Sequence, residues 1–297
     1  RSWKALLIMT KPRIALFLGI LCISIFPVIV RMNLTSGLIS AFYRMAIATA
    51  ILLPIAIYKD KVRLENIKML FPVAVCGILF ASDIAVWNIS IQNSSATQAT
   101  LLTNLSPIWV GVFSFIFLSY RPKKSFWLGT LIALMGMIVF VGIETILEFK
   151  LDFAFFLGIL SGLLYAIYIL VSKNVLAKMN IVTFMLYSMI FSTVFLFFIN
   201  VFFHESFVGF SEKAWISLFV QGIVCQLIAW LLISYATQKM RATRVSLSLL
   251  SQAIFATILA AIFVNEKITN VQMIGSVIIL AGIATTFYEK KTVPKSL

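Results

Sequence analysis

Two ionisable residues, Arg44 and Asp83, stand inside long apolar stretches of the chain. Such residues cost about 2.5–3.5 kcal/mol each at the centre of a membrane-spanning helix, so they are rare and often functional. The first stretch begins near Gly37 and the second ends near Ser90, which places both residues at a similar depth, roughly 10 Å from one end. Equal depth permits a purely structural salt bridge. The alternative is a gating or coupling element that responds to protons.

Asp83 has an aromatic neighbour on its own helix face. Trp87 follows four residues later, and residues four apart lie one above the other on a helix. A carboxylate beside an indole can hold a cation or an aromatic group, and Asn88 adds an amide next to this face. Trp87 could equally belong to the aromatic belt at the membrane surface. Asp83, Trp87 and Asn88 are therefore candidate substrate-binding residues.

Other apolar stretches carry polar and aromatic side chains that could line a cavity. Thr100 and Asn104 share one helix face, and Pro107 frees a backbone carbonyl near Thr103. The remaining candidate binding residues are Tyr165, Tyr168, Gln226, Trp230 and Gln252. Such groups suit either interhelical hydrogen bonds, worth about 0.6 kcal/mol on average, or a solvated cavity wall. A pocket with aromatic walls and a few amides favours a flat or amphipathic metabolite.

The elements that must position these residues are helices that span a membrane. Hydrophobic residues make up 62% of the chain and charged residues 11%, against about 25% charged residues in soluble domains. Apolar runs long enough to cross a hydrocarbon core of about 30 Å recur along the whole chain. We expect ten spans, at 14–30, 37–57, 69–90, 96–118, 126–143, 153–172, 181–203, 214–236, 245–264 and 269–288. The sequence therefore predicts an all-α membrane protein with ten transmembrane helices.

An internal repeat divides these spans into two sets. Residues 90–136 and 236–282 align without a gap at a constant offset of 146. Identical pairs include Gln92/Gln238, Thr97/Thr243, Gly129/Gly275 and Gly136/Gly282. A repeat of this length predicts a duplicated unit, with a first five-helix repeat at 1–148 and a second at 149–297. The spacing of the paired glycines is typical of close helix packing rather than of ligand binding.

An odd number of spans in each copy inverts one half relative to the other. Inverted halves can open a shared midplane cavity first to one side of the membrane and then to the other, which is the basis of alternating access. A secondary carrier is therefore the main hypothesis, and a membrane-embedded ligand-binding or scaffold protein without flux is the alternative. A channel would need a continuous polar or charged ring, which two buried charges do not supply.

The basic residues indicate how the chain is oriented. Nineteen of the Lys and Arg residues fall in segments on the side of both termini, and only Arg31, Lys150, Lys213 and Lys267 fall on the other side. Cytoplasmic loops carry an excess of Lys and Arg, so both termini are expected in the cytoplasm of a multi-pass protein of the bacterial inner membrane. Arg44 and Asp83 then lie nearer the external face. The net charge of +14 reflects this topology, and no nucleic-acid partner is expected.

Catalysis and metal binding lack the residues that they need. His204 is the only histidine, and Cys22, Cys76 and Cys225 all lie within predicted spans. An odd set of buried cysteines is typical of free thiols rather than of disulfides. We therefore expect no enzyme activity, no catalytic residues, no metal and no cofactor.

Several motifs resemble the EamA-type signature of the drug/metabolite transporter superfamily. The first copy has Ser106-Pro107, Tyr120, Gly129 and Gly136, and the second has Asn265-Glu266-Lys267, Gly275 and Gly282. Ile39 to Arg44 in the second span, and Gly158 to Gly162 with Tyr165-Ala166 in the sixth, are also similar to that family. The resemblance covers essentially the whole chain.

The resemblance implies a carrier of small organic metabolites such as amino acids or nucleobases. Its expected partners are a small-molecule substrate and the lipid bilayer, with protons as a candidate coupling ion. Two positions depart from the family pattern: Tyr120 stands where a Glu is usual, and Ala253 stands where the second copy usually has Pro. The second departure predicts a straighter ninth helix than fourth. Substrate identity, direction of transport and oligomeric state do not follow from the sequence.

Overall fold

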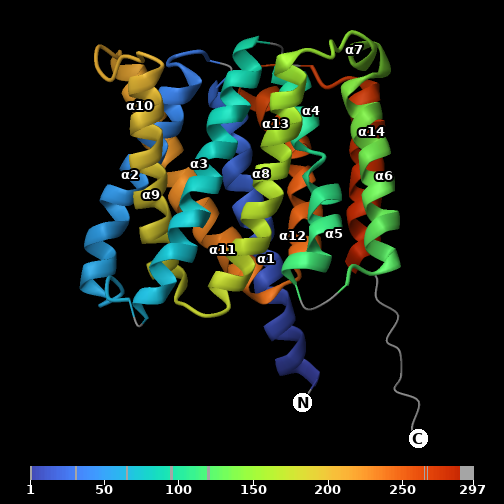
Figure 1. The fold of residues 1–297 in the computed structure, drawn as a ribbon. Coiled ribbons are helices and arrows are strands. Elements are labelled where there is room, and N and C mark those ends of the chain that lie inside the picture. Colours follow the sequence, from blue (N-terminus) through green and yellow to red (C-terminus); the bar gives the residue numbers. More distant parts are fainter. Residues whose placement is uncertain are drawn as a thin grey trace, which may run out of the picture.

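The computed structural model describes residues 2–30, 32–64, 66–93, 96–118, 121–263, 265 and 267–287, with backbone alone for 2–10 and 96–97. Within these ranges the chain is helical and contains no strand. Ten helical segments are long and apolar enough to cross a membrane (Figure 1). The ten predicted spans are therefore confirmed, with ends that differ by a few residues.

The first half contains α1 (Ser2–Val30), α2 (Gly37–Tyr58), η1 (Ile67–Met69), α3 (Leu70–Asn93), α4 (Ala96–Thr103), α5 (Ser106–Phe117) and α6 (Lys124–Val141). The short helix α7 (Ile143–Leu147) connects it to the second half. The second half contains α8 (Phe153–Leu176), α9 (Ile181–Phe202), α10 (Glu212–Val220), η2 (Gln221–Ile228), α11 (Ala229–Lys239), α12 (Ala242–Ser248), η3 (Leu249–Ser251), α13 (Gln252–Phe263) and α14 (Asn270–Phe287). The segments α4 and α5, α10 to α11, and α12 to α13 each form one span.

Polar residues start several of these helices where the apolar runs begin. The Ser36 hydroxyl accepts a hydrogen bond from Ile39 N at 3.3 Å at the start of α2. The Asp152 carboxylate accepts one from Phe155 N at 3.0 Å at the start of α8. Side chains of this kind satisfy amide groups that have no partner within the helix. These two spans therefore begin where a capping residue meets an apolar run.

The fourth and ninth spans are interrupted at equivalent positions of the repeat. Asn104 and Leu105 form a turn between α4 and α5, and Pro107, which cannot donate a helical hydrogen bond, is the second residue of α5. At an offset of 146, the ninth span changes to a 3-10 turn at Leu249–Ser251. With Ala253 in place of proline, the chain stays helical there. The ninth span is thus less interrupted than the fourth, but the regular α-helix is broken at the equivalent position in both copies of the repeat.

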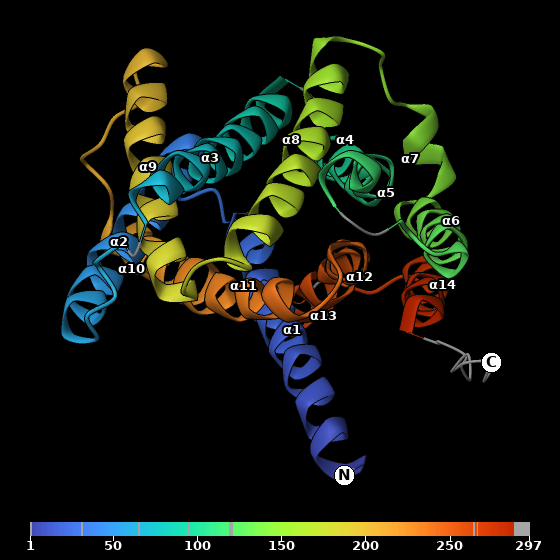
Figure 2. The same ribbon diagram turned by 60° about the horizontal axis from the view of Figure 1, so that its bottom comes forward.

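The helices α6 and α14 form the most extensive helix contact and lie side by side at one edge of the molecule (Figures 1 and 2). A Cβ atom added to Gly282 would lie 2.5 Å from Ala133 N and 2.6 Å from Gly129 O. One added to Gly136 would lie 2.6 Å from Ile279 N. The paired glycines therefore permit the close helix packing that the sequence predicted.

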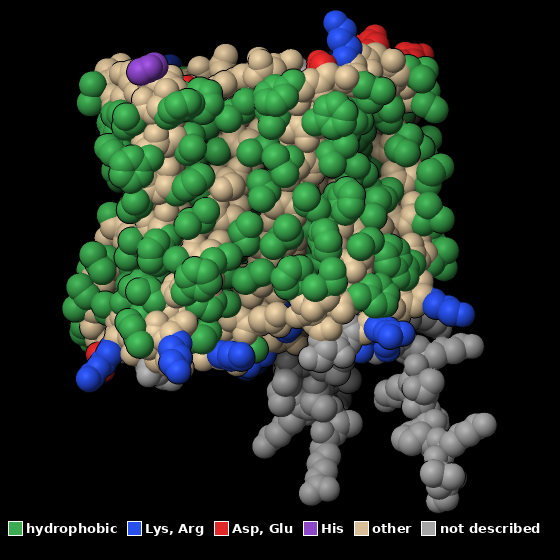
Figure 3. Space-filling view, in the orientation of Figure 1, with side chains coloured by type: hydrophobic (Ala, Val, Ile, Leu, Met, Phe, Trp, Pro, Cys, Tyr) green, Lys and Arg blue, Asp and Glu red, His purple; other side chains and the backbone are tan. Residues whose placement is uncertain are grey.

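The visible surface has a broad hydrophobic band between two polar edges (Figure 3). Lys and Arg gather along the bottom edge, where α1 begins and α14 ends in Figure 1, whereas Asp, Glu and the histidine gather mainly along the top edge. Large apolar side chains on the band are exposed, among them Phe198, Leu131 and Ile274. Such a band suits contact with lipid tails.

Candidate functional site

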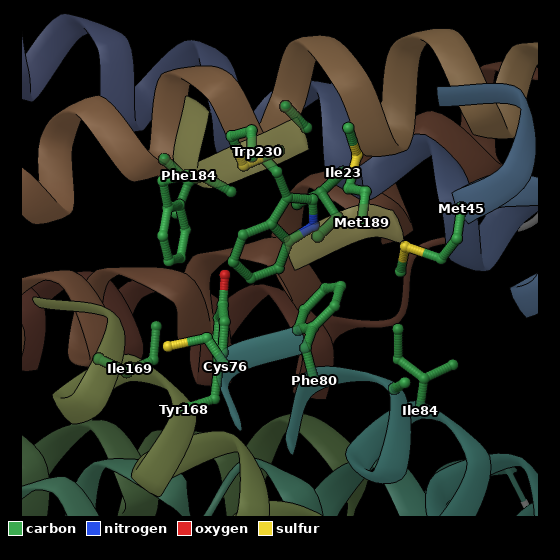
Figure 4. Close-up of a cluster of buried hydrophobic side chains, with 14 of the residues drawn as sticks. Ile23, Met45, Cys76, Phe80, Ile84, Tyr168, Ile169, Phe184, Met189 and Trp230 are labelled. Atoms are coloured by element: carbon green, nitrogen blue, oxygen red, sulfur yellow. The ribbon is translucent and has the colours of Figure 1, made fainter. Parts of the chain in front are cut away.

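Three aromatic rings from three helices meet in the buried interior (Figure 4). Phe80 of α3 lies 4.8 Å from Tyr168 of α8 and 4.6 Å from Trp230 of α11, measured between ring centroids. Tyr165 lies 6.3 Å from Trp230. Sequence reasoning singled out Tyr165, Tyr168 and Trp230, and the structure brings them together. Phe80 was missed, although its position three residues before Asp83 puts it on the same helix face.

Asp83 begins a short chain of polar contacts that joins three helices. Its carboxylate, on a side chain only 7% exposed, accepts a hydrogen bond of 2.5 Å from the Ser161 hydroxyl of α8. The Thr103 hydroxyl of α4 lies 2.9 Å from the Ser161 hydroxyl. Gly162 permits this approach, because a Cβ atom there would lie 2.9 Å from Thr103 O. Sequence reasoning gave Ser161 no binding role, and the small residues around it were the available signal.

Arg44 does not form the salt bridge that equal depth permitted. Its guanidinium lies 4.6 Å from the ring centroid of Phe26 of α1, and Phe26 lies 6.2 Å from the half-buried ring of Trp87. The positions of Arg44 and Asp83 along their helices determine how deep each residue lies in the membrane. The direction of each side chain depends instead on its neighbours, and here the Phe26 ring packs against the guanidinium.

Three buried polar atoms in this region have no hydrogen-bond partner among the described residues: Arg44 Nε, Gln226 Oε1 and Trp230 Nε1. Leaving such a group unpaired costs about 1–3 kcal/mol, and each case in a native structure calls for an explanation. Gln226 lies in η2, a π-helical segment, and π-helical turns occur frequently at functional sites. The unpaired atoms therefore mark a place where a ligand could supply the missing bonds.

Other predicted binding residues do not join this cluster. The Asn88 amide donates to Ile84 O of its own helix at 2.8 Å, and its side chain packs against Gly37. The Gln252 amide donates to Ile23 O at 3.4 Å. Thr100 and Asn104 are half-buried and make no side-chain hydrogen bond within the described ranges. The Thr97 side chain, Tyr120 and Glu266 lie outside the described residues.

Two small pockets lie at opposite ends of the helices. A pocket at the upper end is lined by Ser40, Ser217 and Gln221 with their neighbours, and one at the lower end by Lys123, Arg241 and Arg244 with theirs. Each has a cavity volume of only about 10 Å³, roughly the space of one water molecule. Neither pocket has room for a metabolite.

Polar bonds tie the helices together at the lower end. The Lys173 ammonium of α8 donates to three carbonyls at the end of α11: Thr237 O at 2.7 Å, Gln238 O at 2.9 Å and Met240 O at 2.8 Å. Gln238 in turn donates to Leu176 O of α8 at 2.6 Å. Cations near a helix C-terminus satisfy its last carbonyls. The ends of α8 and α11 are therefore locked to each other.

Polar bonds also join segments at the upper end. The Ser90 hydroxyl of α3 donates to Ala154 O of α8 at 2.7 Å. The Ser36 hydroxyl donates to Glu205 at 2.7 Å, and the Tyr43 hydroxyl donates to Phe207 O at 2.7 Å.

Among the described residues, no group of His, Cys, Asp or Glu could hold a metal ion.

Ten spans in two inverted five-helix halves, packed around buried charges and aromatic rings, define a membrane protein of the transporter class. The EamA-like transporter family matches the chain twice, over residues 10–142 and 152–288, and the chain belongs to this family. It is therefore a membrane transporter, for which a small-molecule substrate is implied.

Known relatives agree with this assignment. The chain is 25% identical to an uncharacterized transporter of Archaeoglobus fulgidus over 251 residues, covering 83% of this chain and 86% of the relative. It is also 25% identical to the uncharacterized transporter YdfC of Bacillus subtilis over 252 residues, covering 83% and 80%. One solved crystal structure superposes with a TM-score of 0.79 at 17% identity, covering 93% of this chain and 96% of that one. That likeness concerns the fold.

Proposed function

We propose that the protein is a secondary carrier that moves a small organic metabolite across the cytoplasmic membrane by alternating access. The observation that carries the proposal is the buried cluster of charged and aromatic side chains between the two halves. Arg44, Phe80 and Asp83 come from the first half, and Tyr168 and Trp230 come from the second. A site shared by inverted halves is the arrangement that alternating access requires.

The boundary between the halves is proposed at 148/149, with one five-helix repeat on either side. In support, the first family match ends at residue 142 and the second begins at residue 152, and α7 lies between the two matches. Both termini are proposed to face the cytoplasm of a bacterial inner membrane. In support, Lys and Arg gather along the edge where α1 begins and α14 ends (Figure 3).

We assign the central binding role to Asp83, Trp87, Tyr165, Tyr168, Gln226 and Trp230. Asn88, Thr100, Asn104 and Gln252 are proposed to reach the substrate only when the helices rearrange, because they lie apart from the cluster here. Arg44 and Asp83 are the proposed coupling pair, with protons as the coupling ion. Their burial without an ion pair supports this role, since binding or protonation can change the balance of two such charges.

Counterflow in reconstituted vesicles tests the proposal. Vesicles loaded with an unlabelled metabolite should accumulate the labelled compound transiently, whereas vesicles without protein should not. Pools of amino acids, nucleobases and organic cations would be compared. Thermal stabilisation of the protein by a pool without any counterflow would overturn the carrier function and favour a ligand-binding or scaffold protein. Flux through an open pore, with no dependence on the internal metabolite, would favour a channel.

A further inference from the structure

We propose that the pocket at the lower end of α6, α12 and α14 binds the phosphate group of an anionic phospholipid. The polar part of its lining consists of basic and hydroxyl-bearing residues: Lys123, Ser125, Arg241, Thr243, Arg244 and Thr286. The pocket lies at the edge of the molecule where Lys and Arg gather (Figure 3). None of these residues belongs to the buried cluster of charged and aromatic side chains, so the site is distinct from the proposed substrate site.

The charge of the pocket is the first part of the argument. Lys123 precedes α6, Arg241 and Arg244 stand at the start of α12, and no Asp or Glu among the described residues lines the pocket. The guanidinium groups of Arg13 and Arg244 lie 5.2 and 5.5 Å from the centroid of the same Phe287 ring. Positive charge is therefore concentrated at this end of α14. A cleft lined by charges of one sign raises the local concentration of ions of the opposite sign.

The geometry of Arg244 is the second part. Its Nε donates to Thr286 O of α14 at 3.0 Å, and this bond together with the Phe287 ring holds the guanidinium in one orientation. A guanidinium presents a planar fork of donors that matches phosphate oxygens. The cavity volume of about 10 Å³ is roughly the space of one water molecule. The pocket can therefore admit one phosphate oxygen, while the rest of the group lies across its mouth.

The surface beside the pocket favours a lipid over a free phosphate ion. Directly after Ser125, α6 presents Trp127, Leu128 and Leu131 with 36%, 55% and 61% of their surface exposed. Exposed apolar side chains on a membrane-spanning helix suit acyl chains, and a tryptophan suits the level of the headgroups. Basic pockets between membrane-spanning helices on the cytoplasmic side are sites for anionic headgroups. An anionic phospholipid thus matches both the pocket and the apolar surface next to it.

Lipid titrations on the purified full-length protein test the proposal. Protein in detergent would be titrated with phosphatidylglycerol or phosphatidylcholine, with bound lipid counted by native mass spectrometry and the melting temperature measured in parallel. Phosphatidylglycerol should bind more tightly and raise the melting temperature more, because phosphatidylcholine carries a cation next to its phosphate. Inorganic phosphate is the third probe. It should neither displace phosphatidylglycerol nor raise the melting temperature, because it gains nothing from the apolar surface.

Charge-neutralising variants assign the preference to the pocket. Arg241→Gln and Arg244→Gln should each weaken phosphatidylglycerol binding by roughly 10- to 100-fold, as expected for a lost hydrogen bond to a charged group. Lys123→Gln, at an exposed position, should weaken it by about fivefold. Arg121→Gln is the matched control. Arg121 is a basic residue close to the pocket in sequence, but its guanidinium lies 5.9 Å from the centroid of the Phe115 ring. This variant should bind phosphatidylglycerol as the wild type does.

Several results would overturn the proposal. Equal binding of the two lipids by the wild type, or an equal loss in Arg121→Gln and in the pocket variants, would reject a specific site. Inorganic phosphate that binds as tightly as phosphatidylglycerol would identify a site for a soluble anion instead. If Arg244→Gln does not fold because it loses the bond to Thr286 O, Lys123→Gln decides, since its side chain is exposed.

An acidic residue of the chain itself is the remaining competitor for the pocket. Glu289 follows Phe287 by two residues and lies outside the described residues. If phosphatidylglycerol bound to Glu289→Gln but not to the wild type, the carboxylate of Glu289 would be the anion that the basic residues hold, and the proposal would fail. Equal preference for phosphatidylglycerol in Glu289→Gln and the wild type would support a lipid site.

Discussion

Ser161 donates a 2.5 Å hydrogen bond to Asp83 and thereby joins α8 of the second half to α3 of the first. Both side chains are buried. Together with the contact between Ser161 and Thr103, the bond links the halves at the level of the proposed site. Any rearrangement that separates α3 from α8 must break it, so its strength affects how readily the site opens.

Ser161→Ala should weaken transport without preventing folding. Removing a hydrogen bond to a charged group costs about 1.5–3 kcal/mol, which corresponds to a change of roughly 10- to 100-fold in uptake at low substrate concentration. Initial uptake rates in vesicles would measure it. Ser172→Ala is the matched control, because Ser172 is buried on the same helix but bonds only to Ile169 O. Equal rates in the two variants would count against a role for Ser161.

Asp83→Asn should reduce transport and flatten its dependence on external pH while leaving expression intact. Asparagine keeps the size of the side chain and its bond with Ser161 but cannot exchange a proton. Uptake would be measured over a series of external pH values in wild-type and variant vesicles. Asp60→Asn is the control at an exposed position. Unchanged pH-dependent uptake in Asp83→Asn would rule out a coupling role for this carboxyl group.

Gly282→Val should destabilise the protein by separating α6 from α14. A Cβ atom at this position would meet backbone atoms of Ala133 and Gly129 at 2.5 and 2.6 Å, and backbone cannot move aside as a side chain can. Overpacking of this kind typically costs about 1–3 kcal/mol, which a lower melting temperature of the purified protein would report. The neighbouring Ala281 is exposed, so Ala281→Val should leave the melting temperature unchanged.

Lys173→Met should loosen the lower end of α8 and α11. The change removes three hydrogen bonds to the last carbonyls of α11, and a bond from a charged donor contributes about 1.5–3 kcal/mol. Amide hydrogen exchange over residues 229–239 should become faster. Lys178→Met, at an exposed position two residues beyond α8, should not change exchange there. Protection equal to that of the wild type in Lys173→Met would show that apolar packing holds the two ends together.

Cysteine labelling tests the orientation of the chain. In a background that lacks Cys22, Cys76 and Cys225, Ser206→Cys should react with a membrane-impermeant reagent added to intact cells. Lys178→Cys should react only after the cells are opened. Both positions are exposed, and the proposed topology places them on opposite sides of the membrane. The opposite labelling pattern would invert the topology, and labelling of both from outside would contradict it.

The spans and part of the site could be predicted because they depend on local sequence. The length and hydropathy of the apolar runs predicted the ten spans, since each span must cross the same hydrocarbon thickness. Helical spacing also placed Asp83 and Trp87 on one face. Tyr168 and Trp230 were recognisable by residue type, because large aromatic residues inside a span have few alternatives to packing or binding.

The contacts between helices could not be predicted in the same way. Depth along α2 and α3 suggested an ion pair between Arg44 and Asp83, but Phe26 of α1 occupies the position next to the guanidinium. Ser161 is a small residue in an apolar run. Its hydrogen bond to Asp83 could be recognised only once the packing of α8 against α3 was known. The π-helical turn at Gln221–Ile228 likewise follows from packing rather than from a local signal.

The breaks at 104–105 and 249–251 divide each of these spans into two arms. If the halves of an alternating-access carrier were identical, its inward-facing and outward-facing states would be related by a two-fold axis in the membrane plane and would have equal conformational energy. Pro107 has no counterpart at Ala253, so we expect the two breaks to differ in stiffness. In a carrier that works as proposed, this difference would favour one of the two states, and the proline would do so without touching the substrate.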